Sequence, residues 1–151
     1  MADIRMTEQE REAFLAEPRV GVLSVTAEAG RPPHMVPVWY AYEPGGDLIF
    51  FSGSQGRTTR KTALLEQAGV VSFSVQHPDP PYRYVTIEGR VVSTQSPPPP
   101  EAMLNILRRY LPEEHAQGFV AAELAQPGPS SVLFTIRPER WLTANFGKLE
   151  G

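Results

Sequence analysis

Short runs rich in β-branched and aromatic residues recur along the chain, and they constrain its fold more than any other feature. Most of the links between them are too short for the crossover that parallel neighbours require, so antiparallel pairing is predicted. Pro37 lies inside the second run and predicts an edge strand or an interrupted pairing, because proline cannot donate to a strand ladder. The runs cover residues 20–27, 34–42, 47–52, 70–75, 82–93, 131–137 and 141–146.

Helical signals surround these runs. Thr7 followed by Glu10 is a capping box and predicts a short helix ending near Ala16. Further helices are expected from Thr58 or Thr59 to Ala68, and over 101–111 and 113–125, after a connector of four prolines at 97–100. The order predicts a mainly β fold with peripheral helices. The expected form is a closed or split, Greek-key-like antiparallel β-barrel that makes residues 1–151 a single cofactor-binding domain.

Composition narrows the function classes. The net charge of −3 argues against a dedicated nucleic-acid binder, because such proteins rely on many cationic contacts to phosphates. The absence of cysteine excludes disulfides, thiolate metal sites and cysteine nucleophiles. No apolar run approaches membrane-spanning length and the N-terminus does not resemble a signal peptide, so a soluble cytoplasmic protein without a membrane partner is expected.

The sharpest chemical feature is the segment 51–61, where a strand ends, a loop rich in glycine and hydroxyls follows, and a helix begins. Arg57, Arg60 and Lys61 fall in this loop and the first helical turn. A helix N-terminus carries partial positive charge, so cations concentrated there repel the helix dipole unless an anion lies between them. Backbone N–H groups, hydroxyls and cationic side chains together favour phosphate. From this segment alone, a solvated basic helix start is an equally good interpretation.

The second run offers a flat wall. A strand interrupted by Pro37 exposes backbone N–H and C=O groups that can face a heterocycle, and Val38, Trp39 and Tyr40 follow at once. Taken singly, Trp39 and Tyr40 are better explained as barrel packing.

Several short motifs follow one another in a characteristic order. In chain order they are Gly30-Arg31-Pro32, Val38-Trp39-Tyr40, Phe50-Phe51-Ser52, Thr59-Arg60-Lys61 with Leu65, the valine-rich run 70–75, Glu88-Gly89-Arg90-Val91, and Ile136-Arg137-Pro138-Glu139-Arg140-Trp141. Their order and spacing resemble the pyridoxamine-phosphate-oxidase-like superfamily, the flavin and deazaflavin split-barrel proteins. The resemblance extends from about Thr7 to Phe146.

The resemblance implies a cofactor, FMN or coenzyme F420, held between the two subunits of a homodimer. In similar proteins the residues matching Ser52, Arg60 and Lys61 bind the cofactor phosphate. The ring lies against the strand that carries Pro37, and the later strands of the partner subunit complete the site, here through Tyr82, Tyr84 and Trp141. The implied cofactor-binding set is Pro37, Val38, Trp39, Phe51, Ser52, Arg57, Thr59, Arg60, Lys61, Tyr84 and Trp141.

The C-terminal segment departs from true pyridoxamine phosphate oxidases. Those enzymes carry an Arg-x-His type motif and a terminal Arg-Leu-x-Pro, whereas residues 141–148 here read WLTANFGK. The resemblance therefore favours a compact deazaflavin-dependent reductase over vitamin B6 oxidation. Arg57 is then expected to face the acidic tail of F420.

The expected function is an oxidoreductase whose cofactor transfers a hydride to or from a small unsaturated substrate. His34, His77 and His115 are scattered, and no Ser-His-Asp set or pair of carboxylates shares a motif, so the sequence assigns no metal site and no catalytic acid or base. A non-catalytic flavin or haem carrier or sensor on the same barrel is the alternative. A cofactor-free interaction domain is a third hypothesis.

Overall fold

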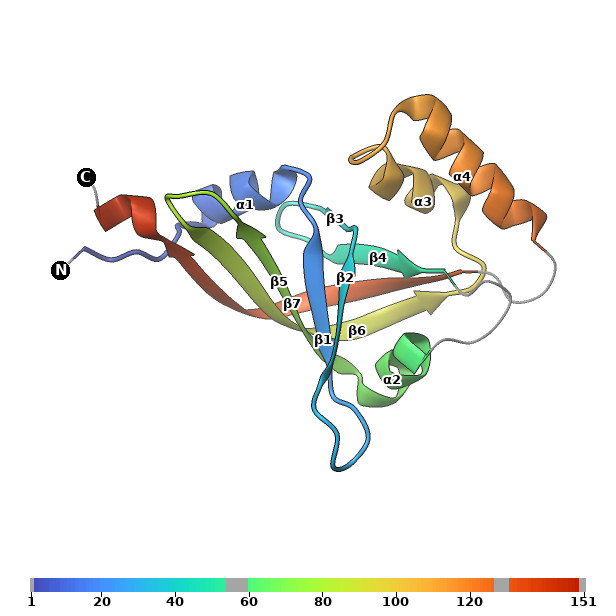
Figure 1. The fold of residues 1–151 in the computed structure, drawn as a ribbon, viewed down its shortest axis with the longest axis horizontal. Helices are drawn as coiled ribbons and strands as arrows, with labels where there is room; N and C mark the ends of the chain where they lie inside the picture. The colour runs from blue at the N-terminus through green and yellow to red at the C-terminus, as the bar shows by residue number, and fades with distance from the viewer. Residues whose placement is uncertain (1, 54–59, 127–130, 150–151) are drawn as a thin grey trace.

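The computed structural model describes residues 2–53, 60–126 and 131–149 (Figure 1). One antiparallel sheet of seven strands has the order β2-β1-β5-β6-β7-β4-β3. Its strands are β1 (Gly21–Val25), β2 (His34–Val38), β3 (Ala41–Tyr42), β4 (Leu48–Ser52), β5 (Val70–His77), β6 (Arg83–Gln95) and β7 (Val132–Asn145). The helices are α1 (Glu8–Ala16), α2 (Arg60–Ala68), α3 (Pro100–Leu107), α4 (Glu113–Ala125) and the 3₁₀ turn η1 (Phe146–Leu149).

The sheet curls almost into a barrel, and its seam lies between β2 and β3. These two strands are the opposite edges of the sheet, yet only Trp39 and Tyr40 separate them in the chain. Two residues span only about 10 Å between the strand ends, so the two edges must approach each other here. The predicted mainly β, antiparallel split barrel is confirmed.

The barrel interior is filled by aromatic and aliphatic side chains. The rings of Phe50 and Phe134 stack at 5.3 Å between centroids, and Phe73 lies 6.4 Å from Phe50. α1 adds Leu15 and α2 adds Leu65, both fully buried. Burial of such side chains is the main favourable contribution to folding, at about 1.5–3 kcal/mol each.

Two local predictions are confirmed. Thr7 caps α1, with its hydroxyl accepting from the Glu10 N–H while the Glu10 carboxylate accepts from the Thr7 N–H. Pro37 lies in an edge strand, as expected for a residue that lacks an N–H group.

The predicted pair of C-terminal strands joined at Pro138 is wrong, because residues Val132–Asn145 form one long strand, β7. Pro138 lies opposite Gly89, where the register between β6 and β7 shifts after Glu88. A proline is tolerated inside a sheet at such an irregularity, because the ladder does not need its missing N–H group.

The N-terminal meander is also different from the prediction. β1 and β2 form a hairpin, but the run 34–42 breaks at the seam, and β3 pairs with β4 at the other edge of the sheet. The proline connector is shorter than predicted, since Pro100 is the first residue of α3. Proline suits that position because its N–H would have no helical partner.

Helices α3 and α4 pack together at one end of the sheet, away from α1 (Figure 1). They form a second, smaller core around Met103, Leu107 and Val120, against which Phe51 of β4 packs. No helix in the described part of the chain is long and apolar enough to cross a membrane.

Candidate functional site

The first turn of α2 contacts the β1–β2 hairpin through Arg60. Its guanidinium donates to the Glu28 carboxylate at 2.7 Å and to Nδ1 of His34 at 2.8 Å. Because arginine can only donate, Nδ1 must be the accepting nitrogen and His34 must be neutral in this arrangement. Hydrogen bonding to Arg60 lowers the pKa of Glu28 to about 2. The charge of Arg60 is therefore already compensated within the protein.

Lys61, the next residue of α2, has no such compensation. It is half-buried, and desolvation lowers the pKa of its ammonium group. No carboxylate of the described residues pairs with it, and the first turn of α2 contains no acidic residue. The pKa of His34 is lowered by burial and then by the charges of Arg60 and Lys61, so all three groups lie in one electropositive cluster.

Ser52, the last residue of β4, is buried with 1% of its surface exposed. Its hydroxyl has no hydrogen-bond partner among the described residues. Leaving a buried hydroxyl unpaired costs about 1–3 kcal/mol, so such a group in a native fold calls for a ligand or an ordered water. Residues 53–59 connect Ser52 to α2, and of the predicted site residues Arg57 and Thr59 lie outside the described part of the chain.

The open edge of β2 forms the second part of the candidate site. One side of β2 pairs with β1, and its other side is the free edge of the sheet. Pro37, Val38 and Trp39 line a hollow of about 310 Å³ together with Val20. Tyr40 instead points into the barrel, where it is fully buried against Phe73, so its interpretation as packing is confirmed.

Three other predicted residues have different surroundings. The side chain of Phe51 contacts Phe119 of α4, with ring centroids 5.8 Å apart, so Phe51 can offer a ligand only its backbone. Trp141 lies between Tyr42 and the Arg11 guanidinium, which is 3.9 Å from its ring centroid.

Tyr84, on β6, joins an exposed aromatic cluster. Its ring lies 5.8 Å from that of Tyr82, which in turn lies 6.0 Å from that of Phe146. Neither Tyr84 nor Trp141 contacts Arg60 or β2 of the same protomer in the described structure. Their role as walls contributed by a partner subunit stays a prediction.

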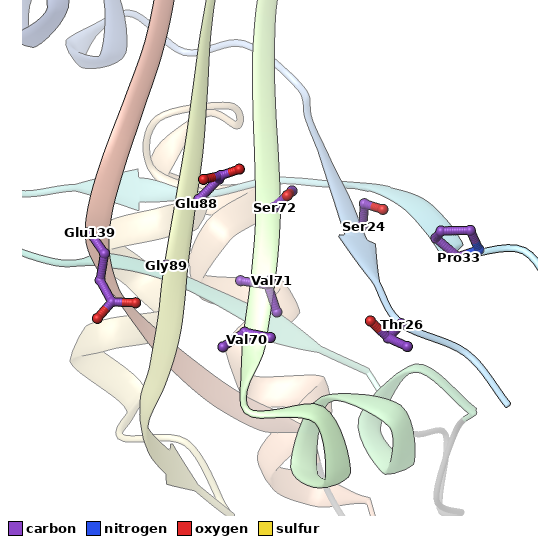
Figure 2. A pocket seen from close by; sticks show the side chains of 9 residues that line it. All are labelled: Ser24, Thr26, Pro33, Val70, Val71, Ser72, Glu88, Gly89 and Glu139. Carbon is purple, nitrogen blue, oxygen red and sulfur yellow. The ribbon is translucent and has the colours of Figure 1, made fainter. Parts of the chain in front are cut away.

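A polar hollow of about 420 Å³ lies on the other side of β1, across β5 and β6 (Figure 2). Glu88 and Glu139 lie at one end of it, and each pairs with an arginine, at 3.6 Å and 3.2 Å respectively. Two carboxylates with no basic lining residue disfavour an anionic ligand, so this hollow is not the phosphate site. Its lining residues are Ser24, Thr26, Pro33, Val70, Val71, Ser72, Glu88, Gly89 and Glu139.

Comparison with known families decides the relationship. A family model described as pyridoxamine 5'-phosphate oxidase matches residues 7–140, which is most of the chain. The chain belongs to this family. The resemblance inferred from the motifs is thereby confirmed, and the family match covers both the Ser52–Lys61 segment and the β2 edge.

Solved structures share the fold of this family member. A conserved hypothetical protein from Mycobacterium tuberculosis has a TM-score of 0.75 at 24% identity, over 100% of this chain and 92% of that one. An F420 reductase has a TM-score of 0.66 at 24% identity, over 87% and 94%. An FAD-binding protein from Mesorhizobium loti has a TM-score of 0.58 at 21% identity, over 91% and 92%. No curated protein matches the chain significantly.

Sequence reasoning missed three residues that shape this region: Glu28, His34 as a partner of Arg60, and Tyr110. Glu28 and His34 flank a turn and give no local sign that α2 will pack on them. Tyr110 lies 70 residues from its partner Tyr40 in the chain. No local pattern signals such a contact.

Proposed function

We propose that this protein binds FMN or coenzyme F420 and catalyses hydride transfer between that cofactor and a small unsaturated substrate. The observation that carries the proposal is the half-buried Lys61 ammonium, which lacks an anionic partner among the described residues. A cofactor phosphate supplies that anion, and the unpaired hydroxyl of Ser52 suits a phosphate oxygen. The fit therefore rests on two groups that the free protein leaves uncompensated.

The proposal also accounts for the distance between the two parts of the site. The electropositive cluster contacts His34 at the start of β2, and Trp39 follows its end. Five residues of extended chain span about 16 Å, which favours an elongated ligand with an anionic end and a flat end. A tricyclic ring joined to a phosphate through a five-carbon chain has this form.

When bound and reduced, such a ring supplies a hydride to an unsaturated substrate, which takes its proton from solvent. The protein's own residues bind and orient the cofactor. Lys61 and Ser52 hold the phosphate, and the open edge of β2 offers its backbone N–H and C=O groups to the polar edge of the ring. The exposed apolar side chains Val20 and Trp39 keep water from the flat face.

We further propose that two copies of the chain form a homodimer with the cofactor between them. The exposed aromatic cluster Tyr82, Tyr84 and Phe146, with Leu142 close by on β7, is an apolar surface of the kind that a subunit interface covers. In a two-fold symmetric dimer each copy can present this surface to the cofactor site of the other.

Subunit complementation tests the shared site. Lys61→Met and Tyr84→Ala are each expected to bind cofactor poorly as homodimers. Co-expressed with two different affinity tags, they form heterodimers in which one site carries both lesions and the other carries neither. Random pairing then restores about a quarter of the wild-type sites. A dimer that shows no recovery contradicts a site shared between subunits, and a monomer in light scattering contradicts the dimer.

Parallel titration with FMN and F420, followed by turnover measurements, tests the function itself. We expect one of the two to bind and the reduced complex to transfer hydride to an unsaturated carbonyl compound at a rate proportional to protein concentration. Binding without turnover would indicate the carrier or sensor function. Absence of binding to either cofactor would contradict the proposal.

A further inference from the structure

Trp39 is held in a near-perfect aromatic stack at the seam of the barrel. Its indole lies parallel to the ring of Tyr110, with centroids 4.7 Å apart and planes 5° apart. The indole nevertheless remains 37% exposed and borders the hollow lined by Val20, Pro37 and Val38. A large aromatic side chain is thus fixed on one side by Tyr110 and left accessible on another.

The hydroxyl of Tyr110 binds the backbone where the two sheet edges separate. It lies 2.8 Å from the carbonyl oxygen of Arg19, to which it donates, and it accepts from the Tyr40 N–H at 3.2 Å. Tyr40 sits between β2 and β3 and has no strand partner there. One side chain therefore fixes both the indole of Trp39 and the backbone that carries it.

Arg109 anchors the same turn independently of Tyr110. Its guanidinium donates to the carbonyl oxygens at the end of α1, those of Leu15, Ala16 and Glu17, at 3.1–3.3 Å. The turn between α3 and α4 is therefore expected to stay in place when only the ring of Tyr110 is removed.

We propose that Tyr110 is a positioning residue that holds Trp39 as the end wall of the cofactor site, so that a neutral, planar, conjugated substrate stacks on the accessible surface of the indole. The residues that line this hollow are Val20, Pro37, Val38 and Trp39, and none is charged. Its volume of about 310 Å³ lies at the small end of the range for small-molecule sites. An apolar lining beside an aromatic plane selects flat, uncharged compounds over charged or puckered ones.

This inference rests on the proposed function, and substrate kinetics test it. The probes are 1,4-naphthoquinone, which is planar, and cyclohex-2-enone, which is smaller and puckered. Tyr110→Leu is expected to raise KM for naphthoquinone about tenfold and to leave kcat and the KM for cyclohexenone within about twofold of wild type, because only the stacking contact is lost. Tyr110→Phe keeps the ring and is expected to restore most of the naphthoquinone affinity. Leu124→Ala on the exposed side of α4 is the matched surface control.

A double-mutant cycle separates positioning from general damage. In a Trp39→Leu background, Tyr110→Leu is expected to have no further effect on the KM for naphthoquinone, because the two residues act through one contact. Equal losses for both probes, or additive effects in the cycle, would overturn the assignment.

Fluorescence provides a readout that does not need cofactor. In Trp141→Phe, Trp39 is the sole tryptophan of the chain. Tyr110→Leu in that background is expected to increase acrylamide quenching of Trp39 about twofold or more, whereas Tyr110→Phe is not. Unchanged quenching would overturn the positioning role even if cofactor binds. Increased quenching with no cofactor bound would leave the stack intact as a finding and place the failure in the proposed function.

Discussion

Lys61→Met is expected to weaken binding of the phosphate-bearing cofactor roughly thirty- to hundredfold, because it removes a charge-assisted hydrogen bond to the phosphate. The methionine keeps most of the apolar stem, so the packing of α2 is preserved. Since the Lys61 ammonium is desolvated and has no anionic partner among the described residues, its removal is also expected to raise the Tm of the free protein. Fluorescence titration and thermal melting measure the two effects.

Arg60→Met is the matched comparison, one residue away on the same helix turn. Arg60 already pairs with Glu28 at 2.7 Å, so its loss is expected to weaken cofactor binding less than the loss of Lys61. In this variant the pKa of Glu28 should rise from about 2 toward its ordinary range, which an NMR titration can follow. A larger loss of affinity in Arg60→Met than in Lys61→Met would contradict the assignment of Lys61 as the main phosphate ligand.

The pH dependence follows from the lowered pKa of Lys61 in the free protein. A bound phosphate favours the protonated ammonium and so raises this pKa. Above about pH 8 the phosphate is already dianionic, so affinity is expected to fall as pH rises through the lowered pKa of Lys61. Lys61→Met should lose this decline. A decline of the same size in both proteins would show that another group is responsible.

Gly89→Ala is expected to destabilise the fold by about 3 kcal/mol and to lower its Tm by roughly 10 °C. A Cβ at this position would lie 2.6 Å from the carbonyl oxygen of Arg137 and 2.8 Å from Cγ2 of Ile136. The oxygen belongs to the backbone of β7, so it cannot move aside without breaking the pairing at the bulge. The glycine in the Glu88-Gly89 motif is therefore explained by close approach of two strands.

Gly118→Ala is the control for this effect. Gly118 lies in the middle of α4, and a Cβ there would meet nothing within 4 Å. Replacing it should stabilise the helix by about 0.5–1 kcal/mol, because alanine has less backbone freedom to lose on folding. Equal melting temperatures for Gly89→Ala and wild type would show that β6 and β7 can separate at the bulge at little cost.

Features that depend on neighbouring residues could be predicted from the sequence. The capping box of Thr7 and Glu10 and the edge position of Pro37 follow from the chemistry of single residues and their immediate surroundings. The split barrel itself followed from short links between strands. Pro138 misled the prediction because its tolerance inside β7 depends on the bulge opposite Gly89, a partner about 50 residues away.

The candidate site was predictable to the same extent. The cations after β4 indicated a phosphate site, but their ranking did not, because Glu28 compensates Arg60 from 32 residues away and leaves Lys61 free. Trp39 was a sound candidate for an aromatic wall. Its rigidity comes from Tyr110, and that contact exists only because the seam brings β2 next to the turn between α3 and α4.

The contribution of the phosphate to binding tests the central claim most directly. Equilibrium titration compares FMN with riboflavin, and F420 with its phosphate-free deazariboflavin, in wild type and in Lys61→Met. Each pair shares a ring. For the pair that binds, the account predicts that wild type prefers the phosphate form by about thirtyfold or more and that Lys61→Met loses most of this preference. Equal affinity of wild type for the phosphate and phosphate-free forms would contradict the account.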